Sequence, residues 1–309
     1  MGEFKTEIIN TTKQIGDLVD LLILLHVPPK PHESTMYIDL EGVNLCREGT
    51  LSIFTLLIDT GTPTSSVYLI DVFSLGVETF ETTGAKGQTL KDILQDENIP
   101  KVFFDVRNDS DVLYAHFGVA LEGVQDVQLM ESAARKTARS RKHLNSLAKC
   151  VEQYAPDRRG LASWRLAKEK GAKLFNPKNG GSFTVFEQRP IPSEIISYCA
   201  GDVQYLPKLW KRFEATANMQ QDLVNKETRE RILASQKPEY KPNGPNRTLA
   251  PWSEDQNRTL DRWHGPGPRA HFDDENAWGL DDDEMWEYNH AEGWDFDKFL
   301  REFVERYRR

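Results

Sequence analysis

Two acidic residues in the N-terminal third of the chain have a spacing that would let both bind one metal ion. Asp39 and Glu41 are separated by one residue in the apolar segment 35–41, which reads TMYIDLE and predicts a β-strand. Side chains alternate along a strand, so both carboxylates lie on one face. Such hard oxygen ligands suit Mg²⁺ or Mn²⁺. The alternative is a strand end that frays into solvent before Gly42.

A tyrosine and an aspartate far along the chain form a second candidate pair. Tyr198 and Asp202 are four residues apart in a predicted helix over 195–213. Residues with this separation lie one turn apart on the same helix face. Taken alone the pair is a weak signal, because a helical tyrosine usually belongs to the core and an aspartate to the surface.

A third acidic position follows a predicted strand over 101–106. Asp109 lies where this strand meets the next helix, and Asp105 and Asp111 are competitors for the same role. Asp109 or Asn108 could instead be the N-cap of that helix.

The order of these motifs is more specific than any one of them. An Asp-x-Glu pair on the first strand, an aspartate after the fourth and a Tyr-x-x-x-Asp pair on a late helix resembles the DEDD exonuclease superfamily. The closest likeness is to RNase D and Werner-type exonuclease domains over residues 5–236, and the run RPIPSEIISYCAGDVQYL at 189–206 is typical of them. Ser197 stands where the histidine branch of the superfamily has its histidine, so the resemblance is to the tyrosine (DEDDy) branch. Phe104 replaces a histidine that many relatives carry.

The resemblance implies a 3′-5′ exonuclease with two divalent ions, Mg²⁺ or Mn²⁺. By this likeness Asp39 bridges both ions, while Glu41 and Asp202 complete the first site. Asp109 holds the second ion, and Tyr198 orients the attacking water. Four clustered carboxylates would repel one another strongly without such cations.

Three residues beside these motifs are expected to contact the substrate. Gly42 would allow the backbone to approach a 3′-terminal sugar, although it could equally serve a turn. Leu45 has the spacing of a leucine that wedges against the terminal base in related proofreading exonucleases, or it is an ordinary packed leucine. Asn108 is the third.

A basic segment is expected to guide a single strand of nucleic acid. Residues 132–180 hold thirteen basic and three acidic residues, a net charge of +10, whereas the whole chain carries −9. Phosphate backbones attract such a segment. We expect Lys168, Lys170 and Lys173 to bind substrate; the alternative is ordinary solvated helix faces.

The elements that would position these residues predict an α/β, RNase H-like fold. We expect a mixed five-stranded sheet whose first three strands are antiparallel, flanked by helices and followed by an irregular, partly helical C-terminal extension. The predicted strands are 35–41, 50–59, 67–73, 101–106 and 119–124. The predicted helices are 11–25, 89–97, 108–118, 126–135, 142–153, 163–170, 195–213 with a break at Pro207, and 222–236.

Composition changes after residue 237 and divides the chain into two expected units. Residues 1–237 would form the exonuclease domain and 238–309 an acidic, tryptophan-rich extension that contains five of the seven tryptophans. So many tryptophans are costly to leave in water. We expect the extension to dock, either on its own domain or on a protein partner.

Composition also limits the class of protein. The three cysteines, Cys46, Cys150 and Cys199, are far apart and form no disulfide or zinc framework, and the longest apolar run, 18–25, is too short to span a bilayer. We expect a soluble intracellular protein, with cytoplasm and nucleus left open. RNA and DNA also remain open as substrates. The competing interpretation is a catalytically weak or inactive protein of the same fold that binds nucleic acid or acts as a scaffold.

Overall fold

The computed structural model describes residues 5–26, 36–59, 65–155, 158–244 and 246–263. Within these residues one mixed sheet contains six strands in the order β1-β4-β3-β2-β5-β6. The strands are β1 (Lys5–Ile9), β2 (Met36–Glu41), β3 (Ile53–Ile58), β4 (Ser66–Asp71), β5 (Lys101–Phe103) and β6 (Val124–Asp126). β2, β3 and β4 form the expected antiparallel meander, and β5 and β6 extend it in parallel beyond β2.

The expected fold class is confirmed, but the expected number of strands is wrong. β1 pairs in parallel with β4 at the edge of the sheet. It has only five residues, of which Lys5 and Thr6 are exposed. A short, half-exposed edge strand has no clear alternation of apolar and polar residues, so the local sequence does not predict it. The last strand also lies later than expected, at Val124–Asp126 rather than 119–124.

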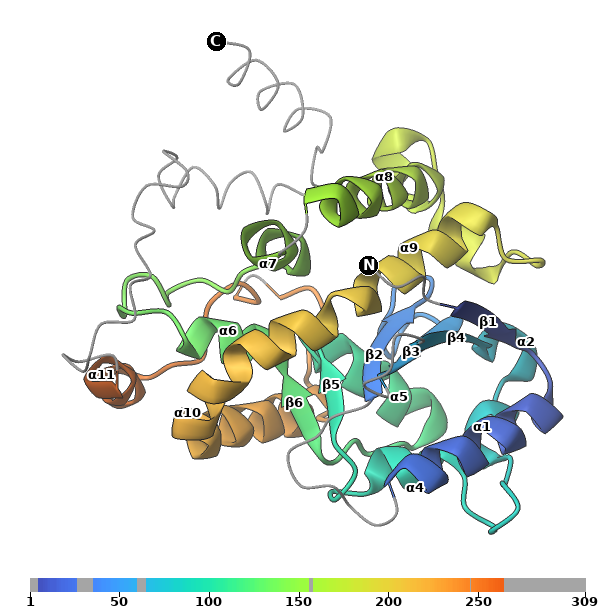
Figure 1. The fold of residues 1–309 in the computed structure, drawn as a ribbon, viewed down its shortest axis with the longest axis horizontal. Coiled ribbons are helices and arrows are strands. Elements are labelled where there is room, and N and C mark those ends of the chain that lie inside the picture. Colours follow the sequence, from blue (N-terminus) through green and yellow to red (C-terminus); the bar gives the residue numbers. More distant parts are fainter. Residues whose placement is uncertain (1–4, 27–35, 60–64, 156–157, 245, 264–309) are drawn as a thin grey trace.

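Helices cover both faces of the sheet (Figure 1). The helices that precede β5 in the chain are α1 (Thr12–His26), α2 (Val72–Leu75), α3 (Glu78–Glu81) and α4 (Leu90–Gln95). Those after it are α5 (Arg107–Phe117), α6 (Val127–Ala133), α7 (Leu147–Tyr154), α8 (Arg158–Phe175), α9 (Ser193–Gln204), α10 (Leu206–Ser235) and α11 (Glu254–Trp263). Short 3₁₀ turns lie at Pro177–Asn179 and Phe183–Glu187. The predicted break near Pro207 is present between α9 and α10, whereas α8 is much longer than the predicted helix 163–170.

The two sides of the sheet hold separate apolar cores. Ile38 and Leu40 of β2 pack in a core with α1, α4 and α5. Tyr37, which points to the opposite face of the strand, packs in the other core with residues of α6, α7, α9 and α10. The strand period of two therefore turns Asp39 and Glu41 toward the face that α9 covers, where α9 contacts β2 and β3.

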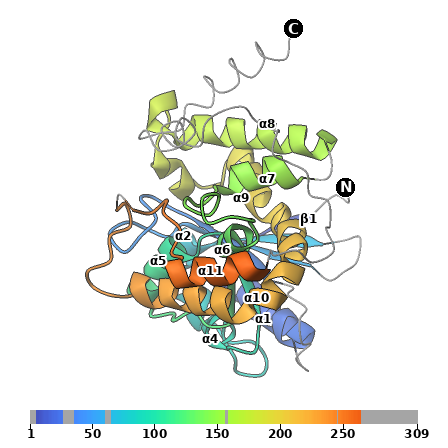
Figure 2. The same ribbon diagram turned by 90° about the vertical axis from the view of Figure 1, so that its left-hand side faces the viewer.

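The chain that follows α10 returns to this second core. Trp252 and Leu260 are buried in the same core as α6 and α10, and Figure 2 shows α11 beside α10. The part of the acidic, tryptophan-rich extension beyond residue 263 lies outside the described residues. None of the helices in the described part of the chain is long and apolar enough to cross a bilayer.

Candidate active site

Three carboxylates from β2 and α9 converge beside the sheet. One oxygen each from Asp39, Glu41 and Asp202 lies within 4.8 Å of the others. Asp39 and Glu41 follow from the alternation of β2, and Asp202 is carried over them because α9 packs on β2 and β3. The donor set contains only carboxylate oxygens, which is what Mg²⁺ and Mn²⁺ prefer.

The electrostatics of this cluster favour a bound cation. Burial, and then repulsion from Asp202, raises the pKa of Asp39 well above its usual range. Burial and the charges of Asp39 and Asp202 do the same to the pKa of Glu41. Repulsion disfavours the simultaneous ionisation of these carboxylates. A divalent ion would bind to them because it neutralises their charges.

A buried polar atom lies on the floor of the same site. Thr55 of β3 is the register partner of Asp39 and is fully buried. Its Oγ1 has no hydrogen-bond partner among the described residues. Cross-strand partners share a face of the sheet, so this hydroxyl belongs to the carboxylate side, and it adds an unsatisfied oxygen to a donor set that fits a hydrated cation.

α8 lies closely against the end of the site that Tyr198 forms. A Cβ on Gly171 would lie 2.6 Å from the Cβ of Tyr198, so only glycine permits this approach of α8 to α9. The Phe175 ring meets the Tyr198 ring edge-on at 5.0 Å between centroids. Burial and the neighbouring Asp202 raise the pKa of the Tyr198 hydroxyl, which keeps it protonated as a hydrogen-bond donor.

Lys168 of α8 binds directly to the carboxylate cluster. Its Nζ donates to both carboxylate oxygens of Asp202, at 2.5 and 2.6 Å, and lies 3.4 Å from the centroid of the Tyr198 ring. Burial raises the pKa of Asp202, and this ammonium opposes the shift. Lys168 thus neutralises part of the negative charge that a metal ion would otherwise neutralise.

Asp109 is not among the three residues whose oxygens lie within 4.8 Å of one another. It is 7% exposed in the first turn of α5. Burial raises the pKa of its carboxyl group, and the charge of Asp39 is the next largest cause. It is not the N-cap of α5, because the cap position is Val106.

The two competing aspartates have other partners. Asp105 receives two hydrogen bonds from Arg107, at 2.5 and 2.7 Å, and this cation holds the pKa of Asp105 well below its usual range against the effect of burial. Asp111 is buried and paired with Arg47 at 2.6 Å. Arginines already neutralise both carboxylates, whereas the carboxyl group of Asp109 experiences the charge of Asp39.

The residues expected to touch substrate have mixed surroundings. A Cβ on Gly42 would lie 1.9 Å from the carbonyl oxygen of Thr50, so the turn after β2 itself requires glycine. Leu45 is half-buried against the core of α1 and α5. Lys170 is exposed, and Lys173 forms a surface pair with Glu169 at 2.6 Å. Substrate binding by these residues remains a prediction.

Several of the cations counted in the basic segment serve the fold. Arg141 is buried and donates to the Asn257 side chain at 2.9 Å and to Asp261. Arg135 binds Glu131, and Arg165 binds Glu152 at 3.1 Å. The local charge of +10 therefore overstates what this segment offers to a phosphate backbone.

Sequence reasoning missed Thr55, Gly171 and the arginines that surround the start of α5. An isolated threonine in an apolar strand and a glycine within a helix were the only local signals. Their roles depend on pairing between β2 and β3 and on packing between α8 and α9, which no local pattern encodes.

The fold and the site define a class: α/β proteins in which carboxylates from a central strand and a late helix converge on one face of a mixed sheet. Residues 26–217 match a family model described as 3′-5′ exonuclease. This match covers more than half of the chain, and the chain belongs to that family.

Two solved structures share the fold of this chain. The Trypanosoma brucei RNase D:GMP complex superposes with a TM-score of 0.60 at 21% identity, covering 92% of this chain and 79% of that one. The T. brucei RNase D complex with RNA U12 gives a TM-score of 0.60 at 21% identity, covering 94% and 89%. At this identity the likeness shows a shared fold.

Among curated proteins, the mouse (Mus musculus) piRNA biogenesis protein EXD1 is 33% identical over 108 residues. The human protein of the same name is 32% identical over the same length. The matched segment is 35% of this chain and only 16% and 18% of those proteins, respectively.

Proposed function

We propose that the chain is a metal-dependent 3′-5′ exonuclease that removes nucleotides from the 3′ end of single-stranded RNA or DNA. The observation that carries the proposal is the convergence of Asp39, Glu41 and Asp202 oxygens within 4.8 Å of one another on a buried face. Membership of the exonuclease family supports the assignment of nuclease chemistry to this cluster.

The carboxylates are the residues that would hold two ions, Mg²⁺ or Mn²⁺. Asp39, Glu41 and Asp202 would hold one, and Asp109 would share the other with Asp39. When bound, such ions stabilise the attacking and leaving oxygens of an in-line displacement at phosphorus. The residues present fit this role, because they supply oxygen ligands whose charges repel one another without a cation.

Tyr198 is the residue proposed to hold the attacking water. Its raised pKa keeps the hydroxyl protonated at neutral pH, so it can donate a hydrogen bond or accept one. α9 places it one turn from Asp202, and contact with Phe175 fixes the ring. Lys168 lies over this ring and would bind the substrate phosphate if it releases Asp202.

The experiment uses single strands of RNA and DNA labelled at the 3′ or the 5′ end, with Mg²⁺, Mn²⁺ or excess EDTA. Release of labelled mononucleotide from the 3′-labelled strand, and a descending ladder from the 5′-labelled one, identify the direction. Asp39→Ala and Asp202→Ala should each lower the rate on the order of a thousandfold, since each removes a ligand of the cations that would stabilise the transition state.

Binding separates catalysis from folding in this experiment. Fluorescence anisotropy on the same strands should show that Asp39→Ala and Asp202→Ala retain affinity within a few-fold. Asp17→Asn is the matched control, because Asp17 is exposed on α1 and pairs with Lys13 on the same helix. Undiminished cleavage by Asp39→Ala, or in EDTA, would overturn the proposal.

One observation favours the second candidate function, a nucleic-acid-binding protein with weak or no catalysis. The ammonium of Lys168 contacts both oxygens of Asp202 and so competes with a metal ion for that carboxylate. Under this alternative the same assays show tight binding of single strands without cleavage in either metal.

A further inference from the structure

A segment beyond the family match returns to the start of α5. We define the strap as residues 237–244 and 246–252. Its backbone pairs with the loop before α7: Leu144 N–H donates to the Thr248 carbonyl at 2.7 Å, and Ala250 N–H donates to the Lys142 carbonyl at 3.0 Å. Trp252 at its end is buried. The family model ends at residue 217, so the strap is an addition to the matched domain.

Two side chains of the strap converge on one atom. The Tyr240 hydroxyl donates to Asn108 Oδ1 at 2.9 Å, and Arg247 Nη1 donates to the same oxygen. Arg247 Nη1 also donates to the Pro242 carbonyl, which fixes the guanidinium within its own loop. Asn108 directly precedes Asp109 in the first turn of α5, so the strap holds the residue next to the expected metal ligand.

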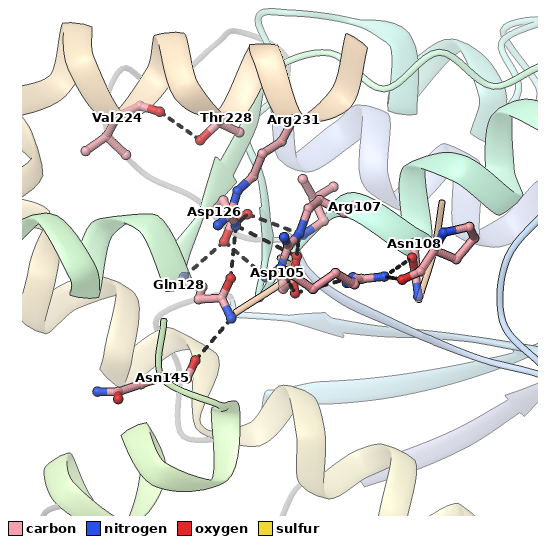
Figure 3. Close-up of polar contacts among 12 residues, drawn as sticks. Asp105, Arg107, Asn108, Asp126, Gln128, Asn145, Val224, Thr228 and Arg231 are labelled. Atoms are coloured by element: carbon pink, nitrogen blue, oxygen red, sulfur yellow. Dashed lines mark hydrogen bonds and ion pairs between the residues drawn. The ribbon is translucent and has the colours of Figure 1, made fainter. Parts of the chain in front are cut away.

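The same turn is held from its other side by a buried ionic network, drawn in Figure 3. Asp105 has φ = 61°, a conformation that residues other than glycine rarely adopt. The Asp126 carboxylate accepts hydrogen bonds from the backbone N–H of Asp105 at 3.0 Å and of Val106 at 3.3 Å. Arg231 of α10 neutralises Asp126 at 2.7 Å. Arg231, like the strap, lies outside the family match.

These tertiary contacts replace a local cap. The N-cap position of α5 is Val106, which has no side chain able to bond the first turn. The conformation of that turn, and so the direction in which Asp109 points, depends on Asp126 from within the matched domain and on Asn108 held by the strap. Arg247 Nη2 lies 3.6 Å from Asp105 Oδ2, so the strap also contacts the ionic network that contains Asp126.

We propose that Tyr240 and Arg247 are positioning residues of the active site, which hold Asn108 and the first turn of α5 so that Asp109 faces Asp39. The inference rests on the proposed exonuclease function. It makes the strap part of the catalytic unit, and it gives Asn108 a role in transmitting this constraint in addition to the substrate contact predicted for it.

The test compares Tyr240→Phe and Arg247→Gln with Arg258→Gln, a matched control in α11 whose exposed side chain pairs with Asp255 of the same helix. Mn²⁺ affinity is measured by electron paramagnetic resonance without substrate, and kcat and KM are measured on a 3′-labelled strand. Partners that orient metal ligands typically contribute 10–100-fold to metal affinity or activity. We expect about tenfold weaker binding of one Mn²⁺ and about tenfold lower kcat for Arg247→Gln, with KM within about twofold.

Two further variants separate positioning from simple structural support. Arg247→Lys keeps the charge but not the planar fork, and should restore only part of the Mn²⁺ affinity. Asn108→Ala combined with Tyr240→Phe should be no worse than Asn108→Ala alone, because both changes break the same hydrogen bond.

Unchanged Mn²⁺ affinity and kcat in both strap variants would overturn the proposal, as would a rise in KM alone, which indicates direct substrate contact. If Arg247→Gln does not fold, Tyr240→Phe, which removes a single oxygen, decides the matter. If the unaltered protein cleaves no substrate, the proposed function fails, and the Mn²⁺ measurements still decide whether the strap positions Asp109.

Discussion

Replacement of Asp39 by asparagine should stabilise the metal-free protein while it destroys the active site. The oxygens of Asp39, Glu41 and Asp202 lie within 4.8 Å of one another. Two unit charges at this separation repel by about 3.5 kcal/mol at an effective dielectric constant of about 20. Partial protonation and the nearby Lys168 ammonium reduce the repulsion, so we expect a gain of about 1–3 kcal/mol from the neutral amide.

The pH dependence of this gain follows from the raised pKa values. Asp39 and Glu41 have folded-state pKa values above those of the unfolded chain. The folded state therefore binds more protons, and the stability it gains is fully present below a pH of about 4, the unfolded pKa. This stability is lost as pH rises through the folded pKa. The advantage of Asp39→Asn should appear at pH 8 and vanish near pH 4.

Differential scanning calorimetry in EDTA measures the effect. For a folded unit of this size, 1–3 kcal/mol corresponds to a rise in Tm of about 2–10 °C at pH 8. Mg²⁺ at about 100 times its Kd should stabilise the unaltered protein by about 2.7 kcal/mol, and Asp39→Asn should lose most of this increment. The exposed Asp17→Asn should change neither quantity. A lower Tm for Asp39→Asn at pH 8 in EDTA, or an equal gain at pH 4, would refute the reasoning.

Three further predictions concern individual residues. Asp109→Asn should abolish cleavage without lowering Tm, because the pKa of Asp109 is raised as that of Asp39 is. Asp111→Asn should instead lower Tm by weakening a buried ion pair and leave kcat within about tenfold; the reverse outcome would identify Asp111 as the ligand. Gly171→Ala should displace α8 from Tyr198, since its Cβ would lie 2.6 Å from the Tyr198 Cβ, and kcat should fall more than single-strand affinity; equal kcat would show that this contact does not position the tyrosine. Lys170→Gln should reduce the slope of log affinity against log salt by about 0.7 on a single strand, and an unchanged slope would place this exposed lysine away from the phosphates.

Sequence alone determined the parts of the site that depend on backbone periodicity. The alternation of β2 placed Asp39 and Glu41 opposite Ile38 and Leu40, and the structure packs the two faces in separate cores. The helical period likewise placed Tyr198 one turn from Asp202. These relations are set by local geometry of strand and helix, which holds wherever the element forms.

The sequence also predicted the order of the strands near the site, but it did not predict the edge strand β1. Apolar segments separated by short turns predicted the antiparallel β2-β3-β4 meander. β1 was missed because its five residues are half-exposed and gain their hydrogen bonds only by pairing with β4, a strand more than fifty residues away in the chain.

Only the tertiary structure decided which charged groups meet. Lys168, predicted from a basic segment, is held on Asp202 because α8 packs on α9 at Gly171. Arg247 reaches Asn108 from 139 residues away. Such contacts depend on how whole elements pack, and an ion pair between distant residues leaves no periodic signal in either segment. Sequence spacing fixed which residues share a face, and packing fixed which faces meet.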